Sequence, residues 1–174
     1  VLAGADVNAK PEGGHGPLVK AMYWGSIDML QFLLEHGADP NERLEDGGTP
    51  LMITAFEGMT EAAHALIEHG ADVNARRANG DTALILTMEH GYTNIAMLLL
   101  ANGADVNAKT NYGWTVLMGA SSKGLTDTVK DLLSRGADVS VKTKKGKTAL
   151  VLAAQYGNAE TVRALIEAGE VPCV

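Results

Sequence analysis

The sequence predicts an all-α solenoid, a stack of short helix pairs joined by protruding loops. Three observations predict it: a 33-residue repeat, glycines that keep the same step, and helix-capping residues in each repeat. The pentapeptide Gly-Ala-Asp-Val-Asn, or a close variant, begins at Gly4, Gly37, Gly70, Gly103 and Gly136. Two further glycine columns, from Gly14 to Gly146 and from Gly25 to Gly157, have the same period. A fixed period of this length is typical of stacked supersecondary units.

Each repeat carries the signals of two helices and a loop. A threonine stands before an apolar stretch at Thr49, Thr82, Thr115 and Thr148, and threonine is a good N-cap residue. A glycine suited to a helix end follows the stretch, and a second helix keeps one leucine in register from Leu33 to Leu165. The polar segment after each Gly-Ala-Asp predicts a hairpin loop. Because such short helices are not stable alone, the stability of the array must lie in the packing between repeats.

The repeat resembles that of ankyrin repeat proteins. The segments GGTPLMITA (47–55), GDTALILTM (80–88) and GKTALVLAA (146–154) are similar to the family's signature, and LLEHGADPN (33–41) is similar to its helix-to-hairpin turn. The resemblance covers the whole chain and implies a single array over 1–174. It implies a tail of one repeat at 1–10, followed by five repeats at 11–43, 44–76, 77–109, 110–142 and 143–174.

The chain departs from the family pattern in several places. Apolar residues replace the signature histidine in every repeat, which predicts apolar packing between repeats; they are Val19, Met52, Ile85, Met118 and Val151. Gly16 stands where a capping threonine belongs, and we expect it to weaken the first helix by up to about 1 kcal/mol. Gly119 inside a helix carries a similar predicted penalty.

The two ends of the sequence also differ from the repeat pattern. Val1 and Leu2 resemble the end of a second helix, which predicts that further chain precedes them. The segment 170–172 abandons the Gly-Ala-Asp turn, as expected where an array ends.

Composition excludes several classes of function. A net charge of −7 argues against general binding to nucleic acid phosphates, and the basic run KTKKGK (142–147) is too short and isolated to change this. No apolar run is long enough to span a membrane. The five histidines have no partners at metal-ligand spacing, and no nucleophile stands in a catalytic context. We therefore expect no enzyme activity, no cofactor, no metal and no small-molecule substrate.

The aromatic residues are the strongest candidates for a function. Columns that hold Tyr23 and Trp24 in the first repeat hold Glu, Ser, Gln, His or Lys in others, so these columns are not core positions. In ankyrin repeat proteins the ends of the first helices and the hairpin tips line the concave face that binds partners, which we call the inner face. Five columns assigned to this face contain six of the eight Phe, Trp and Tyr residues. The candidate partner-binding residues are Tyr23, Trp24, Phe56, Glu57, Glu89, His90, Tyr112, Trp114, Lys123, Lys144, Lys145, Lys147 and Tyr156.

Charges on the same columns are sorted along the array. Acidic residues, Glu12, Glu45, Asp46, Glu57, Asp81 and Glu89, lie in the first three repeats, and lysines lie in the last two. The hypothesis is a protein or peptide partner whose basic part faces the early repeats and whose acidic part faces the late ones. The alternative is that the charges are merely solvated and that Trp24 and Trp114 cover the seams between repeats.

Three further alternatives remain open. The array can instead block a target enzyme or a host protein by occupancy, form the recognition segment of a larger protein, or bind nucleic acid weakly. The single cysteine, Cys173, favours a reducing compartment and hence the cytoplasm, although a removed leader or secretion as an effector would leave the same sequence. Asn74 and Asn107 occupy a hairpin site that is hydroxylated in some ankyrin proteins; otherwise we expect these asparagines to bond their own backbone.

Overall fold

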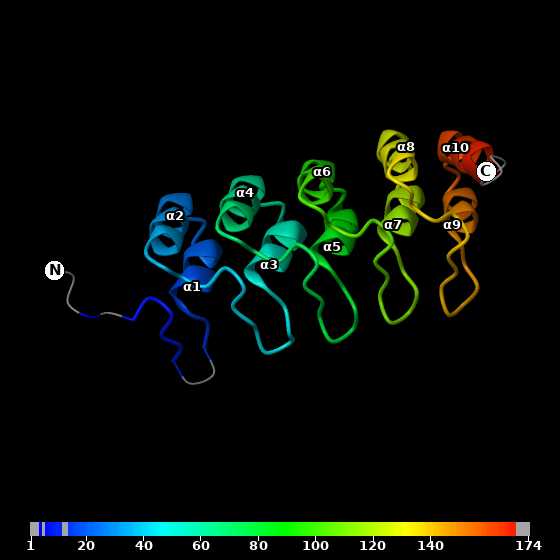
Figure 1. Cartoon of the computed structure of the whole chain (residues 1–174). Helices are drawn as coiled ribbons and strands as arrows, with labels where there is room; N and C mark the ends of the chain where they lie inside the picture. The colour runs from blue at the N-terminus through cyan, green and yellow to red at the C-terminus, as the bar shows by residue number, and fades with distance from the viewer. Residues whose placement is uncertain (1–3, 5, 12–13, 170–174) are drawn as a thin grey trace.

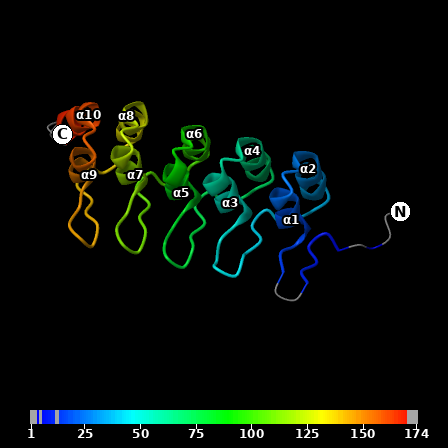
Figure 2. The same ribbon diagram turned by 180° about the vertical axis from the view of Figure 1, so that it is seen from behind.

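The computed structural model describes residues 4, 6–11 and 14–169, which contain ten helices in five consecutive pairs. The pairs lie in a row in sequence order, and the first helix of each pair stands between the second helix and a long loop (Figures 1 and 2). The all-α solenoid is therefore confirmed. The pairs are α1 (Pro17–Tyr23) with α2 (Ile27–Glu35), α3 (Pro50–Glu57) with α4 (Thr60–Glu68), α5 (Ala83–His90) with α6 (Thr93–Ala101), α7 (Val116–Ser122) with α8 (Thr126–Ser134), and α9 (Ala149–Gln155) with α10 (Ala159–Gly169).

The predicted threonine caps are present at the first helices of the last four pairs. The hydroxyl of Thr49 accepts a hydrogen bond from the backbone N–H of Met52 at 3.4 Å, and Thr82, Thr115 and Thr148 do the same in their repeats. Each bond satisfies one of the N–H groups that a helix start leaves unpaired. The caps fix where these helices begin, and thereby where the hairpins end.

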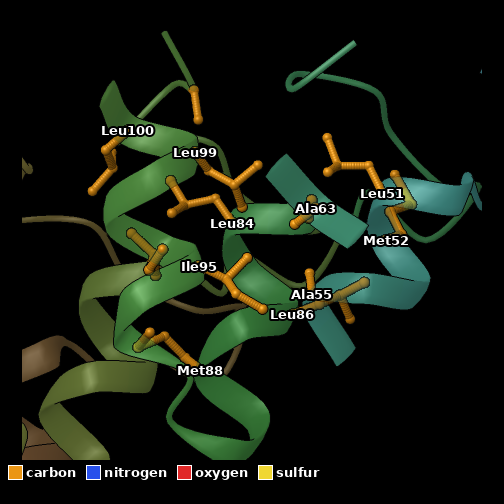
Figure 3. Close-up of a cluster of buried hydrophobic side chains, with 14 of the residues drawn as sticks. Leu51, Met52, Ala55, Ala63, Leu84, Leu86, Met88, Ile95, Leu99 and Leu100 are labelled. Carbon is orange, nitrogen blue, oxygen red and sulfur yellow. The ribbon is translucent and has the colours of Figure 1, made fainter. Parts of the chain in front are cut away.

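Apolar side chains fill the space between neighbouring pairs. Leu51, Met52 and Ala55 of α3 lie on one side of Leu84 and Leu86 of α5, and labelled side chains of α6 lie towards the other side (Figure 3). The residues that replace the signature histidine are buried in the first four repeats, as predicted, whereas Val151 is exposed because no helix of the described residues follows it. The core is thus one continuous layer shared by successive repeats.

A carboxylate from the next hairpin bonds the backbone of Gly16, although α1 itself has no side-chain cap. Glu42 is buried, and its Oε1 accepts a hydrogen bond from the backbone N–H of Gly16 at 3.1 Å. Lys10 Nζ lies 3.1 Å from the same oxygen. A Cβ on Gly16 would lie 2.9 Å from Glu42 Oε2, so the glycine makes room for the carboxylate. Helix α1 therefore lacks the threonine cap of the other first helices, and the residue before it is held by a side chain 26 positions away.

The glycine inside α7 has a packing role. A Cβ on Gly119 would lie 2.6 Å from the Cβ of Met88 on α5, closer than van der Waals contact allows. Gly119 lowers helix propensity, but it lets α7 approach α5 closely. The predicted penalty therefore has a structural reason.

The hairpins are short turns held by backbone bonds. In the third one, Arg77 N–H donates to Asp81 O at 2.9 Å and Gly80 N–H donates to Arg77 O at 2.9 Å, with Gly80 at φ 87°. The hairpins at 44–48, 110–114 and 143–147 repeat this pattern, which requires a left-handed residue and so explains the glycine column from Gly47 to Gly146. Within the described ranges, the only β-bridge is the isolated antiparallel one between Lys109 and Thr115.

The repeated asparagines connect neighbouring hairpins, which corrects the expectation that they bond their own backbone. Asn74 Nδ2 donates to Gly103 O at 2.9 Å, and Asn74 Oδ1 accepts from the backbone N–H of Asp105 at 2.8 Å. Asn8, Asn41 and Asn107 make the same pair of bonds to the next repeat. The local bond comes instead from the aspartate two residues earlier, such as Asp72 to Asn74 N–H at 2.9 Å.

In the fourth repeat the position of these asparagines is held by Ser140. The hydroxyl and the backbone N–H of Ser140 both donate to Asp138, and these hydrogen bonds lower the pKa of the Asp138 carboxyl. The expectations for Val1, Leu2 and the segment 170–172 fall on residues outside the described part of the chain, as do those for Glu12 and Cys173. Among the described helices, none has the length and apolarity that crossing a membrane requires.

Candidate functional site

The ends of the first helices and the hairpin tips form a common surface. Two hollows lie on it, one over the first two repeats and one over the third and fourth. Each is lined both by residues at the end of a first helix and by residues from hairpins. The inner face expected from the sequence is therefore a surface on which one partner can contact helix ends and hairpins together.

The first hollow has a volume of about 740 Å³ and combines aromatic rings with carboxylates. Tyr23, Phe56 and Glu57 line it from the helix ends, and Glu45 lies across from them on a hairpin. The ring of Tyr23 lies 5.5 Å from that of His15, centroid to centroid. Tyr23 and Phe56 are exposed, so the apolar surface of their rings is available to a partner.

Charges in the first hollow are more mixed than the sequence predicted. Arg77 Nη2 lies 3.0 Å from Asp46 Oδ2, so the charge of Asp46 is already paired. Glu45 and Glu57 form no ion pair with any residue of the described ranges. Sequence reasoning missed Arg77 and Glu42 in this hollow. Glu42 had a signal, because the other residues of its column are Ala9, Ala75, Ala108 and Val141.

The second hollow, of about 430 Å³, is the place where the two charge signs meet. Glu89 and Lys123 line it from the ends of α5 and α7, and Tyr112 and Trp114 line it from a hairpin. Tyr112 is exposed, whereas Trp114 is partly buried against the core. Trp114 therefore serves partly as the seam cover that the alternative interpretation described, while one side of the residue lines the hollow.

The other predicted residues lie outside both hollows. Trp24 is 84% exposed at the end of α1, and Tyr156 is exposed at the end of α9. His90 packs edge to face on Phe56 with ring centroids 5.0 Å apart. Three lysines occupy the last hairpin: Lys144 lies 5.4 Å from the ring centroid of Tyr112, Lys147 donates to Gln155 Oε1 at 2.8 Å, and Lys145 is exposed.

The side chains of the inner face are suited to apolar contacts and to electrostatic interactions. Among the described residues, no three His, Cys, Asp or Glu side chains come together in an arrangement that could hold a metal ion. Rings, carboxylates and ammonium groups on a continuous surface are the elements of a protein interface, where large aromatic side chains supply contact area at low entropic cost.

Comparison with protein families gives a match over nearly the whole chain. The family model described as ankyrin repeats (3 copies) matches residues 1–77, 51–143 and 117–173. A search of curated proteins found none that matches the sequence. Ankyrin repeats are generally protein–protein interaction modules and are typically non-catalytic. Repeat period, helix-pair stack and family match agree, and the chain belongs to the ankyrin repeat family.

Proposed function

We propose that this chain is a non-catalytic module that binds a protein or an extended peptide along its inner face. One observation carries the proposal: Tyr23, Trp24, Phe56, Tyr112 and Tyr156 are between 39% and 84% exposed on this face. Uncovered aromatic side chains lose contact with water only when a partner covers them, and burial of such groups dominates the energetics of interfaces.

The charges indicate how the partner lies on this face. Glu45, Glu57 and Glu89 are exposed and form no ion pair within the described residues. Lys123 and Lys145, towards the other end, are likewise exposed and form no ion pair there. A partner with basic groups near the first hollow and acidic groups beyond Lys123 satisfies both sets. Such complementarity mainly sets orientation and association rate. We place the module in the cytoplasm, because a single cysteine allows no internal disulfide.

The proposal is tested by affinity capture followed by titration of the captured partner. Trp24→Ala removes the most exposed ring and is expected to weaken binding by about 2 kcal/mol, since aromatic residues at the centre of interfaces are frequent hot spots. Trp114→Ala is expected to have an effect of similar size. Because Trp114 also packs on the core, its thermal unfolding must be measured in parallel.

Phe32→Ala is the matched control, because Phe32 is an exposed aromatic residue of α2 outside the inner face. It is expected to leave the affinity unchanged. If both tryptophan variants bind the captured partner as tightly as the unmodified chain, the inner face is not the binding surface.

A further inference from the structure

A third hollow lies in the seam between the first and second repeats. It has a volume of about 280 Å³ and is walled mainly by apolar side chains, among them Met22 and Leu30 of the first repeat and Met59 and Ala62 of the second. It shares no lining residue with the two hollows of the inner face. We call it the first-seam hollow. A described helix pair stands on each side of it, α1/α2 and α3/α4, so it lies within the array.

The later seams fill the equivalent place with a side chain of their own. In the second seam, a Cβ on Gly58 would meet the ring of Tyr92 at 2.6 Å. In the first seam, Met59 takes the position of Tyr92, and a Cβ on Gly25 would meet no atom of another segment within 4 Å. The counterparts in the last two seams are Leu125, 3.7 Å from such a Cβ on Gly91, and Asn158, 2.7 Å from one on Gly124.

The second seam shows which chemical group fits this place. Tyr92 is half-buried there and packs on the core, so the array itself accepts an aromatic ring at this position of a seam. The first-seam hollow also has a smaller lining residue, because Ala62 stands where the third repeat has Ile95. Its volume of about 280 Å³ exceeds the roughly 150 Å³ in which an engineered apolar cavity holds benzene. A ring that comes from another molecule therefore fits.

The rim of the first-seam hollow is acidic. Glu61 lines it, is exposed and forms no ion pair with the residues that the structure describes. The hollow continues into another of about 370 Å³ between α2 and α4, since Ile27, Thr60 and Glu61 line both. Glu68 lines the second part, and its Oε1 lies 3.2 Å from His64 Nδ1. Of the described residues, no Lys or Arg lines either part, so positive charge beside an incoming ring is favoured.

We propose that the first-seam hollow binds an aromatic side chain of a partner protein, and that a lysine or arginine next to this side chain lies against Glu61. The ring takes the place that Tyr92 takes in the following seam, and its burial supplies most of the affinity. The cationic group fixes the direction in which the partner's segment runs along α2 and α4. Because this site and the inner face have separate lining residues, the inference is independent of the proposed function.

NMR titration of the whole chain with the capped peptide acetyl-Lys-Tyr-Lys-amide tests the proposal. Saturable shifts are expected for the amide signals of Gly25, Ser26 and Glu61. The peptide acetyl-Lys-Ala-Lys-amide lacks the ring and should bind at least about tenfold more weakly, because most of the buried apolar area is then lost. The peptide acetyl-Glu-Tyr-Glu-amide keeps the ring but reverses the charges, and it should also bind more weakly than the lysine peptide at low salt.

Two variants introduce the residues of the next seam and should close the site. Met59→Tyr supplies the counterpart of Tyr92 and should abolish the peptide-induced shifts at Gly25 and Ser26. Ala62→Ile supplies the counterpart of Ile95 and should weaken binding of the same peptide. Circular dichroism checks that both variants keep the helical fold, which is expected because the second seam already holds this pair of residues.

A matched pair of variants tests the role of the rim. Glu61→Gln should weaken binding of the lysine peptide about threefold, as expected for one exposed ion pair. Asp127→Asn makes the same change of charge at the same column of the fourth repeat, where the residue is also exposed, and should bind the peptide like the unmodified chain.

Three results would overturn the proposal. The first is that the lysine peptide causes no saturable shift at Gly25, Ser26 and Glu61, including the case in which it shifts only signals of the inner face such as those of Tyr23 and Phe56. The second is that Met59→Tyr binds the peptide as tightly as the unmodified chain does. The third is that the alanine peptide binds as tightly as the tyrosine peptide. The first result, with shifts on the inner face alone, would leave the proposed function standing.

Discussion

The seam between the first and second repeats differs from the seam between the second and third, although both have the same backbone arrangement. In the later seam, the ring of Tyr92 lies against Gly58, so closely that a Cβ on Gly58 would meet the ring at 2.6 Å. In the first seam Met59 takes the place of Tyr92, and Gly25 has no neighbouring atom within 4 Å of such a Cβ. A hollow of about 280 Å³ remains there, lined by Met22, Leu30 and Met59 among others.

The first seam adds a polar contact to its apolar core. Glu42 connects Gly16 and Lys10, whereas the equivalent positions of the later seams hold the threonine caps and small apolar residues. The same backbone repeat thus has a tyrosine ring filling one seam, whereas the first seam keeps a hollow and carries a buried carboxylate on its hairpin side. Stability is therefore not expected to be uniform along the array.

The largest expected effect comes from a column that is buried in the third repeat and exposed in the first. Ile95→Ala removes a fully buried side chain of the third repeat and should lower the free energy of unfolding by about 3 kcal/mol, through lost burial and the cavity left behind. Met29→Ala, the same column in the first repeat, should cost far less because Met29 is exposed. Urea unfolding of both variants measures the difference. Equal losses would show that the first repeat is packed like the third.

Glu42→Ala should have the next largest effect, about 2 kcal/mol, because it leaves the buried N–H of Gly16 without its acceptor. The double variant Gly16→Thr with Glu42→Ala introduces the threonine and alanine of the middle repeats and should recover most of this loss. A double-mutant cycle monitored by urea unfolding measures the coupling. Additive effects of the two changes would contradict the coupling expected from the contact between Gly16 and Glu42.

Gly119→Ala tests whether close approach outweighs helix propensity. Alanine should favour the helix by about 1 kcal/mol, but the clash with Met88 should cost more, giving a net loss of about 1 kcal/mol. Thermal unfolding of the variant provides the measurement. A gain in stability would mean that α5 and α7 move apart without cost.

The smallest expected effect is a gain. Met59→Tyr places in the first seam the residue that fills the later one, and should raise the free energy of unfolding by up to about 1 kcal/mol through added apolar burial. Urea unfolding again gives the value. Met59→Gln, similar in length but polar, is the control and should give no gain. If the stability of the tyrosine variant is unchanged, the new ring does not gain apolar burial in the hollow of the first seam.

The sequence predicted those features that depend on local chemistry or on the repeat itself. The helix starts at Thr49 and its equivalents follow from capping within three residues, and the leucine register follows from helical spacing. The hydrogen bond from the Gly16 N–H to Glu42 was missed because Glu42 belongs to another hairpin. The same limit applies to Asn74, whose amide bonds the next repeat, and to the pairing of Asp46 with Arg77.

The candidate site was predicted less completely than the fold. Comparing columns separated framework from variable positions, and the helix-end columns of Tyr23 and Trp24 are indeed uncovered in every repeat except at Ser122. Column comparison cannot tell how far a ring leans over its neighbour. It therefore did not predict that Trp114 is partly buried while Tyr112, two residues away, is exposed. That difference depends on packing against another repeat, which a single column does not record.

The asparagine bonds between hairpins have a mechanical consequence. The amide of each of these side chains bonds the following turn through both a donor and an acceptor. A force that displaces one hairpin is therefore transmitted to its neighbours. The hairpins are then expected to move together, so that a ligand that tilts one of them alters the spacing of the others.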